Sequence, residues 1–279
     1  MIVRPPVVAG TFYNLHPETL KNQIENCFKH RLGPGLKFVE DDFLAAIVPH
    51  AGYAYSGPIA SWVYSRIKRS NYIILGPNHS GIGPVFSVFP KGIWKTPLGS
   101  VEIDGDGVKQ LVSSNPLLEV DTMSHEYEHS IEVQLPFLQY RFGNEFRIIP
   151  ISVLNYTPSF DFLEECKSVA KTISDFIKNS EESWVVIASS DFTHYQPHEY
   201  AKRVDMSYIE SIEKLDAKDF FVKLQETKGS VCGFGPIAIA IFVSKFLKGR
   251  KGELLKYATS GDVTGDYSSV VGYASIKFV

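Results

Sequence analysis

Three apolar segments of the chain each end in a short turn that carries a histidine or a carboxylate. Each segment is short, contains β-branched residues and stops at proline, glycine or serine, a pattern that predicts a buried strand. The segments and their polar residues are 43–57 with His50, 71–81 with His79, and 183–195 with Asp191 and His194. In open α/β sheets, ligands bind at the carboxyl ends of the strands. We therefore expect these side chains to share one pocket.

Apolar residues at three- and four-residue steps predict helices, and short apolar runs between turns predict further strands. We expect helices over 17–32, 59–68, 108–113, 160–178, 199–215, 217–228 and 237–247. We expect further strands over 85–89, 101–103, 148–153, 256–265 and 269–279, with the last two joined by a Gly-Asp turn. Otherwise, 91–106 is predicted as a loop and 1–13 as an extended arm in which Arg4 packs over the sheet or, alternatively, reaches an anion in the pocket.

The composition is that of an ordinary globular protein and excludes several functional classes. With 279 residues, 44% hydrophobic, and no repeat or linker, the chain is expected to form one α/β domain over residues 1–279. The net charge of −3 argues against a nucleic-acid partner, and no apolar run has the length of a membrane span. The start of the chain lacks the apolar segment of a secretory signal. Three widely spaced cysteines favour a reducing, cytoplasmic location.

The polar strand ends contain residue types that bind transition metals. Imidazole suits iron, copper and zinc, and thiolate suits zinc and Cu(I). Cys27 and Cys166 fall on the apolar faces of predicted helices, whereas Cys232 lies in a glycine-rich loop before a helix, a position that favours thiolate. His50, His79, His194, Asp191 and Cys232 are therefore candidate ligands, although no short Cys-x-x-Cys spacing supports them.

A second metal motif lies at residues 125–129, His-Glu-Tyr-Glu-His. It matches the His-Glu-x-x-His pattern of zinc peptidases, in which both histidines share one helix face and the glutamate activates water. Here Asp121 and Ser124 resemble helix caps, so the motif would fall in a first turn, and Pro136 follows soon after. A peptidase that uses His125, Glu126 and His129 is therefore a weaker alternative.

Two other chemistries have less support. Ser189 and Ser190 lie close to His194, but no Gly-x-Ser-x-Gly elbow surrounds them, which argues against a serine hydrolase. The glycine-containing turns at 76–81 and 261–265 lack the Gly-Lys-Ser/Thr ending of phosphate-binding loops.

Six short motifs, spread in order over most of the chain, resemble those of the Memo family. They are Val-Pro-His-Ala-Gly-Tyr-Ala-Tyr-Ser-Gly at 48–57, Leu-Gly-Pro-Asn-His-Ser-Gly at 75–81, Glu-His-Ser-Ile-Glu-Val-Gln-Leu-Pro at 128–136, Ser-Ser-Asp-Phe-Thr-His-Tyr at 189–195, Cys-Gly-x-Gly-Pro at 232–236 and Thr-Ser-Gly-Asp at 259–262. The resemblance implies a fold like that of class III extradiol dioxygenases, an α/β domain with a mixed central sheet flanked by helices.

The resemblance also implies a pocket and partners. The implied metal ligands are His50, His79 and Cys232, with Asp191, His194 and His129 beside them. The implied metal is Fe(II) or copper, with zinc as a further option, and the implied activity is redox chemistry. Family members are also associated with phosphopeptide binding and, in microbes, with a radical-SAM protein and an AMMECR1-type protein.

The chain differs from the dioxygenase pattern at one position. Those enzymes complete the iron site with a carboxylate, whereas the matching residue here is Cys232. Because thiolate prefers softer metals, ring cleavage does not follow from a shared fold. The leading hypothesis is thus a metal-dependent redox protein, in which Asp191 and His194 orient a ligand or move protons. The alternative is a non-enzymatic module whose cleft binds a peptide or a partner protein.

Overall fold

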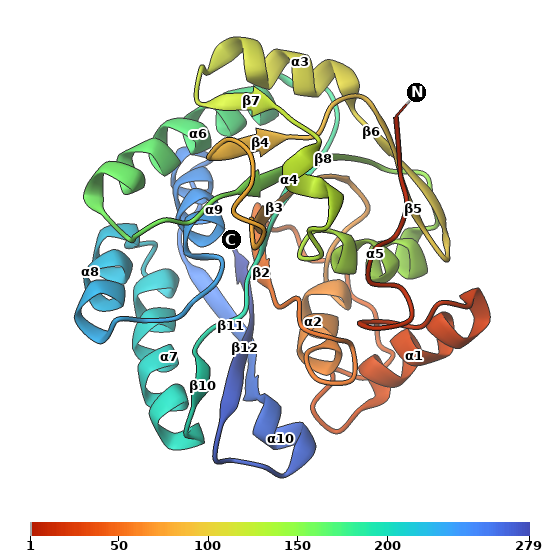
Figure 1. Ribbon diagram of the computed structural model, residues 1–279, viewed down its shortest axis with the longest axis vertical. Coiled ribbons are helices and arrows are strands. Elements are labelled where there is room, and N and C mark those ends of the chain that lie inside the picture. The colour runs from red at the N-terminus through yellow and green to blue at the C-terminus, as the bar shows by residue number, and fades with distance from the viewer. Residues whose placement is uncertain (1) are drawn as a thin grey trace.

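The computed structural model describes residues 2–279 and consists of a mixed sheet with helices on both faces (Figure 1). The strands are β1 Ile2–Arg4, β2 Ala45–Val48, β3 Asn71–Pro77, β4 Phe86–Val88, β5 Gly92–Thr96, β6 Gly99–Ile103, β7 Leu118–Val120, β8 Arg147–Val153, β9 Trp184–Ser189, β10 His194–Gln196, β11 Gly252–Thr259 and β12 Val270–Phe278. The helices are α1 Pro17–Lys29, α2 Gly57–Tyr64, α3 Gly105–Ser114, α4 Met123–Glu126, α5 Leu135–Phe142, α6 Phe160–Asn179, α7 His198–Glu213, α8 Ala217–Thr227, α9 Phe234–Phe246 and α10 Ser260–Thr264, and a 3-10 turn spans Glu132–Gln134.

The order of the sheet is β1-β5-β6-β8-β3-β9-β2-β12-β10, with β11 against β12, and with β4 between β7 and β8. Four central neighbours, β8, β3, β9 and β2, are parallel, whereas β12 pairs with β2 in the antiparallel direction. The predicted α/β fold with a mixed central sheet and flanking helices is confirmed. Because β2, β3 and β9 are parallel, the residues that follow them emerge at the same edge.

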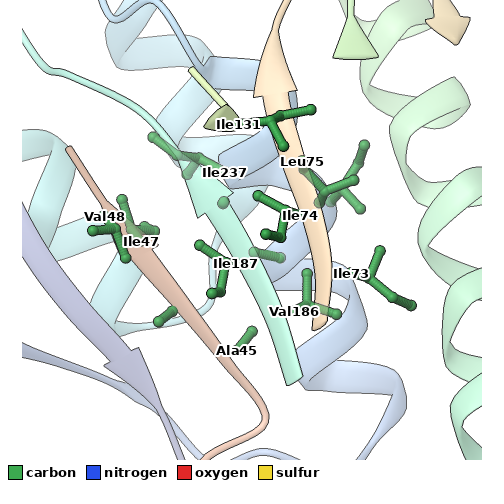
Figure 2. Close-up of a cluster of buried hydrophobic side chains, with 14 of the residues drawn as sticks. Ala45, Ile47, Val48, Ile73, Ile74, Leu75, Ile131, Val186, Ile187 and Ile237 are labelled. Atoms are coloured by element: carbon green, nitrogen blue, oxygen red, sulfur yellow. The ribbon is translucent and has the colours of Figure 1, made fainter. Parts of the chain in front are cut away.

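The core is formed by the central strands and the helices on either side of them. Figure 2 shows side chains of β2, β3 and β9 in contact with Ile237 of α9 and with Ile131. On one face α9 packs on these strands and is covered by α6, and on the other face α2 is covered by α1 and α5. The strands are buried on both faces, which is why they read as continuous apolar runs rather than as alternating patterns.

Several predicted boundaries differ from those observed. Residues 92–96, predicted as loop, form β5, because the strand-favouring Ile93, Trp94 and Thr96 pair with β6. The predicted strand 256–265 ends at Thr259, and residues 260–264 form the short helix α10, which begins with a capping box between Thr259 and Asp262. The third histidine-tipped strand ends at Ser189, and His194 opens the separate strand β10.

The predicted N-terminal arm runs beside the segment 125–132; Met1 lies outside the described residues. Arg4 is buried and forms a 2.7 Å ion pair with Glu132, and its Nε donates to the carbonyl oxygen of His125. Its guanidinium lies 4.1 Å from the centre of the Trp94 ring. The favoured interpretation of Arg4 as a packing residue is therefore correct. The anion that it contacts is the carboxylate of Glu132 and not a ligand in the pocket.

Glu132 also accepts hydrogen bonds from Tyr13 and from the backbone N–H groups of Val7 and Val8. The arm and the segment 125–132 are thus joined by a buried polar network. Within residues 2–279, no helix is both long and apolar enough to cross a bilayer.

Replacing Arg4 should destabilise the protein, because Glu132 would be left buried without a counter-ion. Arg4→Ala is expected to lower the free energy of unfolding by about 3–5 kcal/mol, as for other broken buried pairs. Urea denaturation followed by circular dichroism measures this change. The matched control is Arg69→Ala, which removes an exposed pair with Glu145 and should cost about 1 kcal/mol or less. Equal losses in the two variants would contradict the assignment.

Candidate metal centre

His50 follows β2 and is held in one orientation by its neighbours. Its Nδ1 lies 2.9 Å from Ser189 Oγ, and the Ser189 hydroxyl donates to the carbonyl oxygen of Ser130 at 2.7 Å. Because the Ser189 hydroxyl hydrogen is donated to Ser130, Ser189 Oγ can only accept from its other two neighbours. These are His50 Nδ1–H and Gln134 Nε2, which is 2.8 Å away. The network therefore assigns the hydrogen to Nδ1 and leaves a lone pair on Nε2.

His79 follows β3 and is held by a buried carboxylate. Its backbone N–H donates to Glu128 Oε2 at 2.7 Å, and its Nδ1 lies 3.0 Å from Glu128 Oε1. Burial opposes charge on Glu128, but the hydrogen bonds from His79 outweigh it and hold the pKa of Glu128 well below its usual value. Burial likewise opposes the imidazolium of His79, and the bond to Glu128 outweighs it and raises the pKa of His79.

His129 completes a group of three imidazoles. One nitrogen from each of His50, His79 and His129 lies within 4.8 Å of the corresponding nitrogens of the other two. The His129 ring stacks on His79 with a centroid distance of 4.8 Å, and Phe12 packs against its edge at 4.7 Å. Burial lowers the pKa of both His50 and His129, so these two rings are neutral near pH 7 and offer lone pairs.

Cys232 lies beside this group, with Sγ 3.3 Å from His50 Nε2. The backbone N–H of Asp191 donates to Sγ at 3.2 Å, and the Nδ2 group of Asn155 donates to the carbonyl oxygen of Cys232 at 2.6 Å. The sequence predicts a thiolate here, whereas the surroundings of the sulfur favour the thiol as long as no metal ion is bound. Burial, aided by the nearby Asp191 carboxylate, raises the pKa of Cys232 well above that of a free thiol and outweighs its position near the start of α9.

Gly233 allows the cysteine loop to approach the end of β9. A Cβ atom built on Gly233 would lie 2.6 Å from the carbonyl oxygen of Ser189 and 2.6 Å from Ser190 Cβ, far inside van der Waals contact. Its N–H instead donates to Ser190 Oγ at 3.0 Å. The absent side chain is therefore what lets Cys232 reach His50.

Asp191 and His194 lie at the same end of the sheet but have different partners. Asp191 Oδ1 accepts the backbone N–H of His50 at 2.8 Å, and burial raises the pKa of Asp191 to about 6. His194 donates from Nδ1 to the carbonyl oxygen of Ser230 at 2.9 Å, which leaves its Nε2 free. Asp191 thus positions the His50 loop, while His194 remains half-exposed beside Tyr195.

The structure separates the three residues of the peptidase motif. Helix α4 ends at Glu126, so His125 and His129 do not share a helix face. His125 is fully buried, and its Nε2 lies 3.1 Å from the carbonyl oxygen of Ser87, while Glu126 is exposed. A zinc peptidase centre on these residues is excluded. The hydroxyls of Ser189 and Ser190 donate to backbone carbonyls, which argues against a serine hydrolase, as the sequence does.

Sequence reasoning identified His50 and His79 from their strand ends but did not assign a function to Glu128. The signal that was available is its place in the motif at 128–136, where the glutamate directly precedes His129. Pattern alone does not show that this carboxylate folds back 49 residues along the chain onto His79.

The comparisons with known proteins agree over the whole chain. The Memo-like protein family model matches residues 4–277. The chain belongs to the Memo family. MEMO1 family proteins of Methanopyrus kandleri and Saccharolobus solfataricus are each 44% identical to it, over 99% of this chain and 98% and 99% of theirs.

A solved structure supports the fold alone. It is the crystal structure of an uncharacterized protein from Escherichia coli K12, with a TM-score of 0.55 and 11% identity, covering 85% of this chain and 100% of that one. The Memo family identity therefore rests on the sequence comparisons, and the site is described from its own geometry.

A second buried carboxylate supports the segment that carries Asp191 and His194. Asp205 of α7 accepts hydrogen bonds from the backbone N–H and hydroxyl of Thr193, at 3.1 and 2.5 Å, and from the Tyr257 hydroxyl at 2.8 Å. Burial raises the pKa of Asp205 to about 6 despite these bonds.

The stability of the protein should therefore depend on Asp205 at mildly acidic pH. Because the pKa is higher in the folded state, the folded protein binds the proton more tightly between about pH 4 and pH 6. Stability contributed by the protonated carboxyl is complete below the unfolded pKa and is lost as the pH rises through about 6. Asp205→Asn should remove this dependence, a difference of about 3 kcal/mol for a shift of two pKa units.

Chemical denaturation at pH 4, 5, 6 and 7 measures this dependence for the wild type and the variant. The control is Asp106→Asn in the exposed first turn of α3, which should leave the profile unchanged. Parallel profiles for the wild type and Asp205→Asn would contradict the prediction.

Proposed function

We propose that this Memo family chain is a metal-dependent redox protein whose centre is built on His50 and His79. The observation that carries the proposal is the approach of three imidazoles within 4.8 Å, two of them with Nδ1 hydrogen bonded to groups behind the ring. That arrangement, in which the second nitrogen of each histidine is fixed by a polar partner, is typical of metal-binding histidines.

His129 and Cys232 are the two further donors. His129 is neutral and stacked on His79, and the sulfur of Cys232 lies against His50 Nε2. Imidazole nitrogens suit iron, copper and zinc, and a sulfur donor favours copper or zinc. We propose Fe(II) or copper as the resident metal, since either would supply one-electron chemistry, with zinc as a structural alternative.

The chain's own groups would handle substrate and protons. Asp191 has a pKa of about 6, so it can exchange a proton near neutral pH, and its position is fixed by the N–H of His50. His194, with Nε2 unused, is the accessible imidazole at the same edge of the sheet. We propose that these two residues orient a small ligand and move a proton. The resemblance to extradiol dioxygenases implies that Cys232 stands where those enzymes carry a carboxylate, so ring cleavage is not part of the proposal.

A second candidate function is the binding of a peptide or partner protein. A cavity of about 620 Å³, lined mainly by the N-terminal arm, Phe89 and Tyr127, lies beside the segment that carries His129. Tyr127 is 74% exposed there, so its ring is available to a partner. The resemblance to the family makes a radical-SAM protein and an AMMECR1-type protein the partners to test.

Metal content tests the first proposal. Protein purified without chelator should contain iron or copper, and His50→Ala, His129→Ala and Cys232→Ser should each retain less of it. The control is His16→Ala, which changes an exposed histidine outside the group. Copper loading should produce a sulfur-to-copper absorption band that Cys232→Ser removes and His129→Ala keeps. Unchanged metal in both His50→Ala and Cys232→Ser would defeat the proposal.

Pull-down with purified radical-SAM and AMMECR1-type proteins from the same organism tests the second candidate function, the binding of a partner protein. Retention by the wild type that is lost in Tyr127→Ala but kept in His50→Ala would favour a binding role for the cavity. No retention by the wild type, or equal retention by the two variants, would argue against that role.

A further inference from the structure

Glu128 is a charged residue that is completely buried, and its contacts concentrate on one histidine. Its carboxylate accepts three N–H groups: the backbone N–H of His79 at 2.7 Å, the Nδ1–H of His79 at 3.0 Å, and the backbone N–H of Ser130 at 2.8 Å. His129 lies next to this carboxylate as well, with its Nδ1 3.6 Å from Glu128 Oε1. Because Glu128 is buried, water does not compete for its oxygens, and the carboxylate can hold the His79 ring in one tautomer although the two residues lie far apart in sequence.

We propose that Glu128 is a positioning residue that fixes the tautomer and ring orientation of His79, so that Nε2 offers its lone pair to the histidine group. An ionised carboxylate accepts hydrogen bonds and donates none. In the neutral ring, the hydrogen must therefore sit on Nδ1 of His79, which leaves Nε2 unprotonated. This inference rests on the proposed metal function for its consequence, but the tautomer itself is a property of the protein without metal.

The carboxylate is held in place from several directions. The backbone oxygen of Glu128 accepts a hydrogen bond from Arg4, and the Ser130 hydroxyl donates to the carbonyl oxygen of Pro77 at 3.2 Å, two residues before His79. Gly76 lets the two segments meet, because a Cβ there would lie 2.3 Å from Ser130 Oγ. Rotation of the His79 ring by a half-turn would therefore break its bond to Glu128 without the carboxylate being able to follow.

His50 provides an internal comparison. Its Nδ1 hydrogen is fixed by Ser189, which belongs to β9 and does not contact Glu128 through any hydrogen bond found in residues 2–279. A change at Glu128 should therefore alter the tautomer of His79 and leave that of His50 unchanged. A general loss of structure would alter both.

Glu128→Gln is the informative substitution because it keeps the size and replaces one acceptor oxygen by an NH2 donor. With a single oxygen for three N–H groups, the amide cannot satisfy them all, and its NH2 can donate to Nδ1 of the alternative His79 tautomer. That tautomer carries its hydrogen on Nε2, which blocks the lone pair. Glu128→Asp keeps the carboxylate on a shorter side chain and should restore the wild-type tautomer in part. The control is Glu126→Gln, two residues away and exposed.

The experiment has two readouts. Long-range ¹H–¹⁵N correlation spectra of the metal-free protein, recorded at a pH at which the His79 ring is neutral, report which ring nitrogen of His79 carries the hydrogen. Competition titration with Zn(II) as the probe reports affinity, which Glu128→Gln should weaken about 10- to 100-fold, as other polar partners of metal-binding histidines do when replaced. Glu126→Gln should match the wild type in both, and Glu128→Asp should fall between.

Two outcomes overturn the inference, and a third separates it from the proposed metal function. A neutral wild-type His79 ring with its hydrogen on Nε2 overturns the inference without any variant, even if Glu128→Gln does not fold. A folded Glu128→Gln protein with an unchanged His79 tautomer and unchanged Zn(II) affinity also overturns it. If the wild type binds no metal but the tautomer of His79 changes as expected, the proposed function fails while the positioning role of Glu128 stands.

Discussion

The parallel pairing of β2, β9 and β3 is the constraint on which the candidate site depends. Val48 pairs with Ser189, and Leu75 pairs with Ala188, so the three strands reach the same edge in register. His50, Asp191 and His79 follow from that alignment, because each lies two residues beyond the end of its strand. An antiparallel strand in place of any of the three would send one of these side chains to the opposite edge.

Hydrogen bonds then fix the orientation of the site residues, which the direction of the strands does not determine. Ser189 hydrogen bonds to His50, Ser130 and Gln134 at once, and so ties the end of β9 to the segment that contains His129. The same segment is fastened on its far side by the buried pair of Arg4 and Glu132. The residues that hold the imidazoles are therefore fixed before a ligand binds, so binding requires little further loss of conformational entropy.

The parts of the site that could be predicted from sequence are those governed by local pattern. His50 and His79 were found because a proline or glycine turn followed an apolar run, and the Memo family motifs supported them. The protonation of Cys232 could not be predicted, because the desolvation that raises its pKa comes from residues far away in sequence. Strand β5 is not predicted because it is short and lies among glycine, proline and aspartate residues, and its pairing with β1 and β6 is not visible in the local pattern.

The glycine after the cysteine has a consequence for how such centres are recognised in other chains. At position 233 the backbone passes so close to Ser189 and Ser190 that even one methyl group would push the loop outward and carry the sulfur with it. Cysteine and glycine therefore act as one unit, and selection on the sulfur is also selection against every side chain at the next residue. In a distant relative that keeps the cysteine but not the glycine, the sulfur and the imidazole would no longer be neighbours, and the sequence match would overstate the likeness of the two pockets.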